Sequence, residues 1–265
     1  MSALDVDGPA VGSGRMRSVV ATAVRALLAA ALLASAGCPN YAVIPDDQRK
    51  AVDDAHTGAL LFLRQSLYVG QFYDDDRYKL VHPRKLEELT YLQTIEGDAI
   101  APPPAEGIIP AGTRVRVESI EWPTGDVVFR RPLYTPRYTT WVFLRVARER
   151  GREITVERDD RHILLLPGGI SDEDTFDEWF DASLTEDDPN PWLLSLPEDQ
   201  QNGIALKRAI KGMSYDALTA ALGFPDTMQR TVNDGVTVEV GVWGSTTVTM
   251  RDGIVDEVRD SVHHS

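Results

Sequence analysis

The sequence predicts an α+β protein with N-terminal helices, a small antiparallel β-barrel and a C-terminal two-layer α+β module. Three patterns predict this fold: helical spacing of apolar residues after Asp46, alternation of apolar and charged residues over 113–118, and a capped helical segment over 214–222 that precedes several strands separated by turns. We place the parts of the chain at 1–37, 38–100, 101–170, 171–202 and 203–265.

Residues 1–37 have the composition of a bacterial export signal. Arg15 and Arg17 supply a basic start, residues 26–34 are apolar, and Ser35-Ala36-Gly37 precede Cys38, the only cysteine. The apolar run is far shorter than the roughly 20 residues that a membrane-spanning helix needs. Translation from either Met1 or Met16 keeps these features.

The string Ser35-Ala36-Gly37-Cys38 resembles the lipobox of bacterial lipoproteins, with Ser35 at a position where that family favours leucine. The resemblance implies cleavage before Cys38 and lipid attachment to its thiol. Pro39 follows instead of the aspartate that retains enteric lipoproteins in the inner membrane, so the resemblance implies the outer membrane, at its periplasmic face. Stable anchoring would follow, because each buried CH₂ of an acyl chain contributes about 0.8 kcal/mol. The alternative is an ordinary exported protein with a free thiol.

Charge excludes two classes of partner. The chain has a net charge of −14, and loss of residues 1–37 removes three arginines and two aspartates, which leaves −15. Nucleic-acid binding needs basic patches for phosphate contacts, and a polybasic hold on anionic lipid needs clustered cations. We therefore expect no nucleic-acid partner, and membrane attachment only through the lipid anchor.

The region 38–100 is predicted to be helical. Apolar residues from Val52 to Leu67 lie at three- or four-residue spacing, which indicates an amphipathic helix of about 20 residues that ends before Gly70. A second helix is expected over 83–94, where Pro83 suits the first turn. The acidic stretch 72–79 between them lacks the alternating ligands of a calcium loop, so we interpret it as a solvated loop.

The region 101–170 is predicted to be β-structure. Strands are expected over 113–118, 141–146, 154–157 and 162–166. The segment IIPAGTRVRVESIEW over 108–122 resembles the opening of bacterial SH3-like barrels. That resemblance implies an SH3-like barrel; any other small antiparallel barrel or sheet is the alternative.

The acidic segment 171–190 is predicted to contain a short amphipathic helix. Phe176, Trp179, Phe180 and Leu184 fall on one helical stripe, which is expected to pack on the barrel. The prolines at 189, 191 and 197 mark a linker.

The region 203–265 shows the clearest local signals. Ser214 is placed to cap a helix that ends at Gly223, before Pro225. Asn233-Asp234-Gly235 is a strong hairpin turn, and valines alternate with polar or small residues over 236–242.

The string I-x-G-M-S-x-x-x-L-x-x-x-L-G-x-P over 210–225 is similar to the SmpA/OmlA (BamE-like) domain. Members of that family are small outer-membrane lipoproteins that support the machine that inserts β-barrel proteins. The likeness implies a BamE-like α+β domain and envelope partners such as outer-membrane β-barrel assembly components. The family usually lacks the long region that precedes the module here.

No pattern of catalysis or metal binding stands out. The five histidines, His56, His82, His162, His263 and His264, lack metal-ligand spacing, and no nucleophile elbow or phosphate-binding loop follows residue 38. We expect no catalytic residues, no metal and no cofactor.

An aromatic and basic cluster in this acidic chain is the candidate binding surface for an anionic polymer or a peptide. It consists of Arg130, Arg131, Tyr134, Arg137, Tyr138 and Trp141. The alternative is that these residues pack and pair locally.

Taken together, the sequence predicts a non-enzymatic, lipid-anchored envelope protein that acts as a protein-interaction or scaffold module, plausibly in outer-membrane assembly. The alternative is a lipoprotein that binds cell wall (peptidoglycan) or another ligand. An envelope hydrolase is the least favoured hypothesis.

Overall fold

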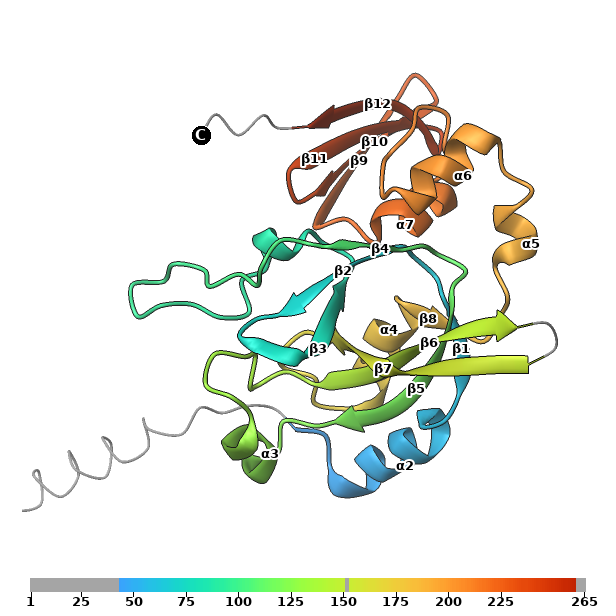
Figure 1. Cartoon of the computed structure of the whole chain (residues 1–265). Helices are drawn as coiled ribbons and strands as arrows, with labels where there is room; N and C mark the ends of the chain where they lie inside the picture. Colours follow the sequence, from blue (N-terminus) through green and yellow to red (C-terminus); the bar gives the residue numbers. More distant parts are fainter. Residues whose placement is uncertain (1–42, 151–152, 261–265) are drawn as a thin grey trace, which may run out of the picture. The chain divides into compact units, whose positions relative to one another are not determined.

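Two β-sheets organise the part of the chain that the computed structural model describes, residues 43–150 and 153–260 (Figure 1). The large sheet has eight strands in the order β4-β2-β3-β7-β6-β5-β1-β8. Its neighbouring strands are antiparallel except β3 and β7, which are parallel. The strands are β1 (Leu60–Leu63), β2 (Leu67–Phe72), β3 (Asp75–His82), β4 (Gly107–Ile109), β5 (Arg114–Glu121), β6 (Trp141–Arg150), β7 (Glu153–Leu165) and β8 (Leu184–Thr185).

The predicted fold class is wrong, because the β-structure is an open mixed sheet and neither a small SH3-like barrel nor another closed barrel. Strands β4 and β8 lie at opposite ends of the order and do not pair with each other. Three strands come from the region predicted to be helical, and the two short strands expected over 154–157 and 162–166 are one long strand, β7.

The predicted lengths of the N-terminal helices are also wrong. Helix α2 (Asp46–His56) has 11 residues, and the chain turns at Gly58, where φ is +87°. The apolar residues that follow form β1 and β2 instead of further helical turns. The helix expected over 83–94 reduces to one 3₁₀ turn, η1 (Leu86–Glu88).

Both faces of the large sheet are buried at the start of β6, and this explains why that strand lacks the alternation expected of a half-exposed sheet. Val142 and Leu144 of β6 belong to one hydrophobic cluster, while Trp141 and Phe143 belong to another on the opposite face. Residues 141–144 at the start of β6 are therefore all apolar.

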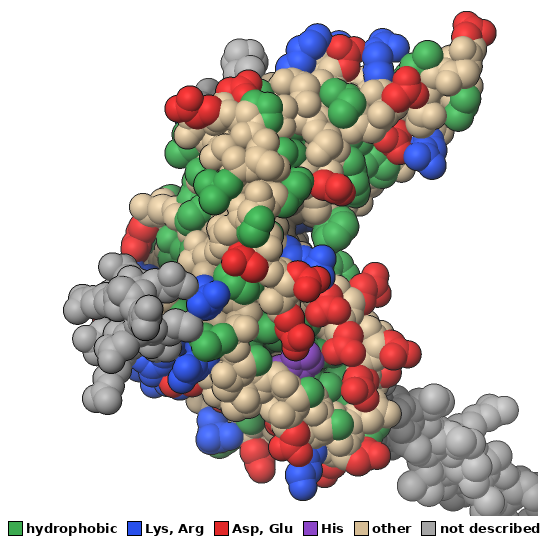
Figure 2. All heavy atoms as spheres, turned by 90° about the vertical axis from the view of Figure 1, so that its right-hand side faces the viewer, with side chains coloured by type: hydrophobic (Ala, Val, Ile, Leu, Met, Phe, Trp, Pro, Cys, Tyr) green, Lys and Arg blue, Asp and Glu red, His purple; other side chains and the backbone are tan. Residues whose placement is uncertain are grey.

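Helices α2 and α4 (Glu173–Asp181) supply side chains to the first of these clusters. Val52 of α2 packs in it with Phe176 and Phe180 of α4, while Trp179 is 44% exposed. Asp172 caps α4 by accepting from the Thr175 N–H at 2.8 Å. The predicted acidic helix is thus confirmed, although Leu184 lies in β8. Carboxylates gather on the lower half of the face shown in Figure 2, consistent with the net charge of −14.

The C-terminal layer, residues 198–260, packs two helices on a four-stranded antiparallel sheet. The sheet order is β12-β11-β10-β9. Its elements are α6 (Glu198–Ala205), α7 (Tyr215–Leu222), β9 (Thr227–Asn233), β10 (Val236–Trp243), β11 (Thr246–Arg251) and β12 (Ile254–Asp260). Two other short helices are α3 (Gly125–Arg130) and α5 (Asn190–Leu193).

Local signals in this layer are confirmed. Ser214 accepts from the Ala217 N–H at 3.2 Å, and Gly223 ends α7 with φ at +86°. Asp234 and Gly235 both have positive φ in the β9–β10 hairpin, as a type I′ turn requires.

The valines of β10 do not face the helices. Gly241 pairs with the buried Val248 of β11, so Gly241 and Trp243 share the face that packs on α6 and α7. The four valines at 236, 238, 240 and 242 point to the opposite face and are half-buried.

No helix within residues 43–150 and 153–260 has both the length and the apolar character needed to cross a membrane.

Candidate functional site

Ser66, in the turn between β1 and β2, joins the large sheet to the C-terminal layer. Its side chain is fully buried. The Ser66 N–H donates to the Ala220 carbonyl at 2.9 Å, its Oγ donates to the Ile204 carbonyl at 2.7 Å, and its Oγ accepts from the Ala111 N–H at 2.9 Å. Both helices of the C-terminal layer are therefore bonded to one residue of the large-sheet region.

Lys207 extends this junction from the other side. It follows α6 in a left-handed conformation (φ +52°), and its Nζ donates to the Ser66 carbonyl at 2.6 Å and the Ala221 carbonyl at 2.9 Å. The Nζ atom also lies 5.2 Å from the centre of the Tyr68 ring. Only 5% of the residue is exposed, and burial lowers the pKa of Lys207 to about 7.

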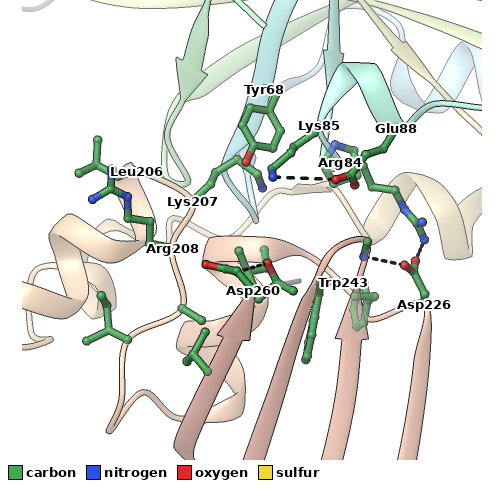
Figure 3. Close-up of a pocket in the computed structure, with 18 residues that line it drawn as sticks. Tyr68, Arg84, Lys85, Glu88, Leu206, Lys207, Arg208, Asp226, Trp243 and Asp260 are labelled. Atoms are coloured by element: carbon green, nitrogen blue, oxygen red, sulfur yellow. Dashed lines mark hydrogen bonds and ion pairs between the residues drawn. The ribbon is translucent and has the colours of Figure 1, made fainter. Parts of the chain in front are cut away.

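A cleft of about 490 Å³ opens beside Lys207, between the segment that follows β3 and the C-terminal layer. Figure 3 shows Tyr68 and Lys85 on one side of it, and Trp243 and Asp260 on the other. Two apolar side chains remain open to solvent there, with Leu206 52% and Phe224 55% exposed.

The carboxylates of the cleft are already engaged. Asp226 pairs with Arg84 and accepts from the Gly244 N–H at 2.8 Å. Glu88 Oε1 lies 3.9 Å from Lys85 Nζ. Asp260 accepts from Thr246 Oγ1 at 2.7 Å. These contacts hold the walls of the cleft in place.

His82 fixes the segment that carries Arg84. Its Nδ1 accepts from the Arg84 N–H at 3.0 Å, and its Nε2 lies 3.3 Å from the Tyr91 hydroxyl. Burial, with a smaller effect of the Arg84 charge, lowers the pKa of His82 to about 3, so the ring is neutral at physiological pH.

A second cavity of about 440 Å³ shares Phe224 with the cleft. Arg64, Trp192 and Tyr215 are among its lining residues. Gln65 closes its inner end: the Nε2 group donates to the Ala182 carbonyl at 3.0 Å, while Oε1 packs against Gly223. Both cavities therefore border the exposed Phe224 side chain.

The cleft lacks the geometry of a serine–lysine dyad. Such a dyad needs the amine beside the serine hydroxyl, but Lys207 Nζ contacts the Ser66 carbonyl oxygen, and Ser66 Oγ donates to the Ile204 carbonyl. Among the described residues, no three His, Cys, Asp or Glu side chains gather as a metal site would require.

The structure divides the candidate binding surface that the sequence predicts. Arg131 and Trp141 are buried, with 5% and 3% exposure. The Arg131 guanidinium lies 3.8 Å from the centre of the Trp141 ring and donates to Glu121 Oε1 and to the carbonyls of Glu121, Arg137 and Thr139. Both residues are therefore packed within the protein and contact local groups.

The other residues of the candidate surface lie outside this buried pair. Arg130 is exposed, Tyr134 and Tyr138 are 63% and 43% exposed, and the half-buried Arg137 donates to the Val128 carbonyl. Cys38, His263 and His264 lie outside the described residues.

The sequence did not predict Lys207, Leu206 or Phe224 as residues of a site. In the sequence Lys207 is one of several basic residues over 207–211, and nothing in that pattern marks it as buried. The position of Phe224 could have been predicted, because an aromatic residue between the helix-ending Gly223 and Pro225 must lie just beyond the end of that helix.

No known protein family matches this chain, and neither do the curated proteins or the solved structures.

Proposed function

We propose that this protein is a non-enzymatic, lipid-anchored envelope protein that binds a segment of a partner protein in the cleft beside Lys207. The export signal and Cys38 support the location, and the likeness of residues 210–225 to the SmpA/OmlA domain supports a partner from outer-membrane β-barrel assembly. The periplasmic face of the outer membrane is the proposed site of action.

One observation carries the binding function: the cleft presents exposed apolar side chains beside carboxylates and a buried lysine that already have partners within the protein. Leu206 and Phe224 are more than half exposed, while Asp226, Asp260 and Lys207 have partners within the protein. A ligand that buries these apolar groups gains hydrophobic free energy without breaking the frame.

The geometry favours an extended segment as the ligand. Both cavities border Phe224, so an extended segment that passes over this residue can contact both of them. Arg208 is exposed at the edge of the cleft and forms no ion pair within the described residues, which favours an acidic group in the ligand.

The cell-wall alternative loses its main support, because it depended on an SH3-like barrel and the sheet is open. Peptidoglycan retention remains a control in the experiment.

The test compares Phe224→Ala and Leu206→Ala with Val232→Ala, which removes a residue of similar exposure (64%) on β9. Full-length protein would be cross-linked in the envelope, purified from membranes, and its partners quantified by mass spectrometry. We expect the cleft variants to lose at least tenfold in partner yield, which corresponds to about 1.4 kcal/mol, and Val232→Ala to retain it. Unchanged yields, or retention on purified cell wall alone, would contradict the proposal.

The anchor has its own test in Cys38→Ser. We expect wild type to have the mass of a chain that begins at Cys38 and carries lipid, and to fractionate with membranes, while the variant is released. An unlipidated wild-type protein in the soluble fraction would refute the anchor.

A further inference from the structure

The aromatic loop, residues 123–140, projects large apolar side chains into solvent. Phe129 is 85% exposed, Leu133 72%, Tyr134 63% and Tyr138 43%. They fall within ten residues of one another, around helix α3. Soluble proteins seldom expose grouped apolar residues of this size without a binding role.

The loop holds these side chains outward on a fixed backbone. Arg131 bonds to three carbonyls and one carboxylate around it, and Trp141 Nε1 donates to the Pro136 carbonyl at 2.8 Å. Thr135 is fully buried and donates to the Pro132 carbonyl at 2.9 Å. Arg131 and Thr135 thus point inward, while Phe129, Leu133 and Tyr134 point outward.

This loop lies at the end of the molecule where the described chain begins. Trp122, just before the loop, donates from Nε1 to Asp53 of α2 at 3.1 Å and packs with Ile44 in the same cluster. Figure 1 shows α2 and α3 at one end and β9–β12 at the other.

The length of the tether brings this end to the membrane. Cys38 and Ile44 are six positions apart, and six extended residues span at most about 20 Å. A lipid on Cys38 would therefore keep the buried Ile44 within about 20 Å of the bilayer surface.

We propose that Phe129, Leu133, Tyr134 and Tyr138 insert into the headgroup region of the bilayer and orient the anchored protein. The inference rests on the lipid anchor of the proposed function. Tyrosine suits this depth, since its ring is apolar and its hydroxyl remains hydrated. A lipid surface is favoured over a protein partner because the tether holds Ile44, at the same end of the protein as this loop, near the bilayer.

Charge neither drives this contact nor prevents it. Arg130 and Arg137 lie in the loop, but Asp126 of α3 and Asp46 and Asp47 of α2 are exposed at the same end. Insertion should therefore depend on apolar area, and we expect it in zwitterionic vesicles and in high salt alike.

The test places a fluorescent probe on the loop. Cys38 is the only native cysteine and is acylated, so Phe129→Cys and the control Val232→Cys can each be labelled with an environment-sensitive dye. The lipidated full-length protein is reconstituted in phosphatidylethanolamine–phosphatidylglycerol vesicles with and without lipid-borne nitroxide quenchers. We expect at least a twofold loss of fluorescence at position 129 and none at 232. Tyr134→Cys provides a second labelled position if Phe129→Cys folds poorly.

Each failure has a distinct meaning. If mass spectrometry shows that the lipid is attached but neither position 129 nor position 134 is quenched, membrane insertion of the loop is wrong and the lipid anchor stands. If the protein carries no lipid, both the lipid anchor and the insertion of the loop are wrong. Loss of partner proteins in Phe129→Ser without quenching at 129 would instead make the loop a protein-docking site and overturn lipid insertion.

Discussion

At the scale of single residues, Lys207 combines a structural role with an unusual protonation equilibrium. A neutral lysine amine has two N–H groups, and the structure supplies two acceptors, the carbonyls of Ser66 and Ala221. Both contacts can therefore survive loss of the third proton. The junction between the large sheet and the C-terminal layer does not need the charge.

This arrangement predicts how stability depends on pH. The pKa of Lys207 is about 7 in the folded chain and about 10.4 in an unfolded one. Between these pH values the unfolded chain binds one more proton, so the free energy of unfolding rises with pH. We expect wild type to gain about 3 kcal/mol from pH 7 to 9.5 through this group, a gain that Lys207→Met lacks.

Urea unfolding at the two pH values measures this difference. Lys211→Met is the matched control, because Lys211 is exposed and pairs with Asp256. A wild type and a Lys207→Met variant with parallel pH profiles would show that the lysine is not buried as described.

Gly223 is a second residue whose surroundings determine how much a substitution lowers stability. Its φ is +86°, and an added Cβ would lie 2.1 Å from Gln65 Oε1. Gly223→Ala therefore combines backbone strain with a clash against a buried side chain, and we expect a loss of about 3 kcal/mol. Gly235→Ala is the control: it has a similar φ of +81° and open space around the Cβ, so about 1 kcal/mol is expected. Equal losses in thermal unfolding would show that the contact with Gln65 has no effect.

At the scale of elements, the aromatic loop depends on one arginine. Burial lowers the pKa of Arg131 to about 10, although its hydrogen bonds to Glu121 oppose this effect. Lysine cannot reproduce the planar fork that reaches Glu121, Arg137 and Thr139 together. We expect Arg131→Lys to lose about 2–4 kcal/mol in urea unfolding and to open residues 123–140 to trypsin. Arg130→Lys should change stability by less than about 0.5 kcal/mol; a large effect there would contradict this assignment.

The elements that sequence reasoning predicted correctly are those set by neighbouring residues. Ser214, Gly223 and the Asn233–Gly235 turn determine the backbone within a few positions, and all three behave as predicted. The sequence also predicted helix α4, because the apolar stripe of this helix lies within nine consecutive residues.

Elements set by distant residues were not predicted. The apolar run Leu60–Leu63 continues the helical spacing of α2, and only the turn at Gly58 separates a strand from a longer helix. The parallel pairing of Lys79 with His162 joins segments that no periodicity connects. In β10 the alternating valines favour a buried valine face, but Gly241 and Trp243 face the helices because the ring of Trp243 covers Gly241.

The candidate binding surface also could not be predicted in full from neighbouring residues. Arg130 and Arg131 are adjacent and chemically identical, yet one is exposed and the other is enclosed by Glu121 and Thr139. Only the tertiary structure separates a surface cation from a structural one.

At the scale of the whole molecule, the junction at Ser66 should make the two sheets unfold together. Ser66 bonds to Ile204, Ala220 and Ala111, so Ser66→Ala removes the two bonds of Oγ. The Ala111 N–H then loses its partner, while the Ile204 carbonyl still accepts from the Lys207 N–H. We expect wild type to unfold in one transition. In Ser66→Ala, hydrogen exchange should show that residues 203–260 open before the large sheet. Simultaneous exchange of both sheets in the variant would show that other contacts couple them.

The order of strands in the large sheet also constrains when this chain can fold. Strand β1 lies between β5 and β8, and Arg64 at its end donates to the Leu184 carbonyl, 120 residues away. If the chain leaves the cytoplasm N-terminus first, the apolar segment 60–63 cannot pair with β5 until residues 114–116 have crossed, or with β8 until residues 184–185 have crossed. Long-range pairing of this kind is slow and exposes the chain to aggregation. Newly exported molecules should therefore depend on a holding chaperone during translocation.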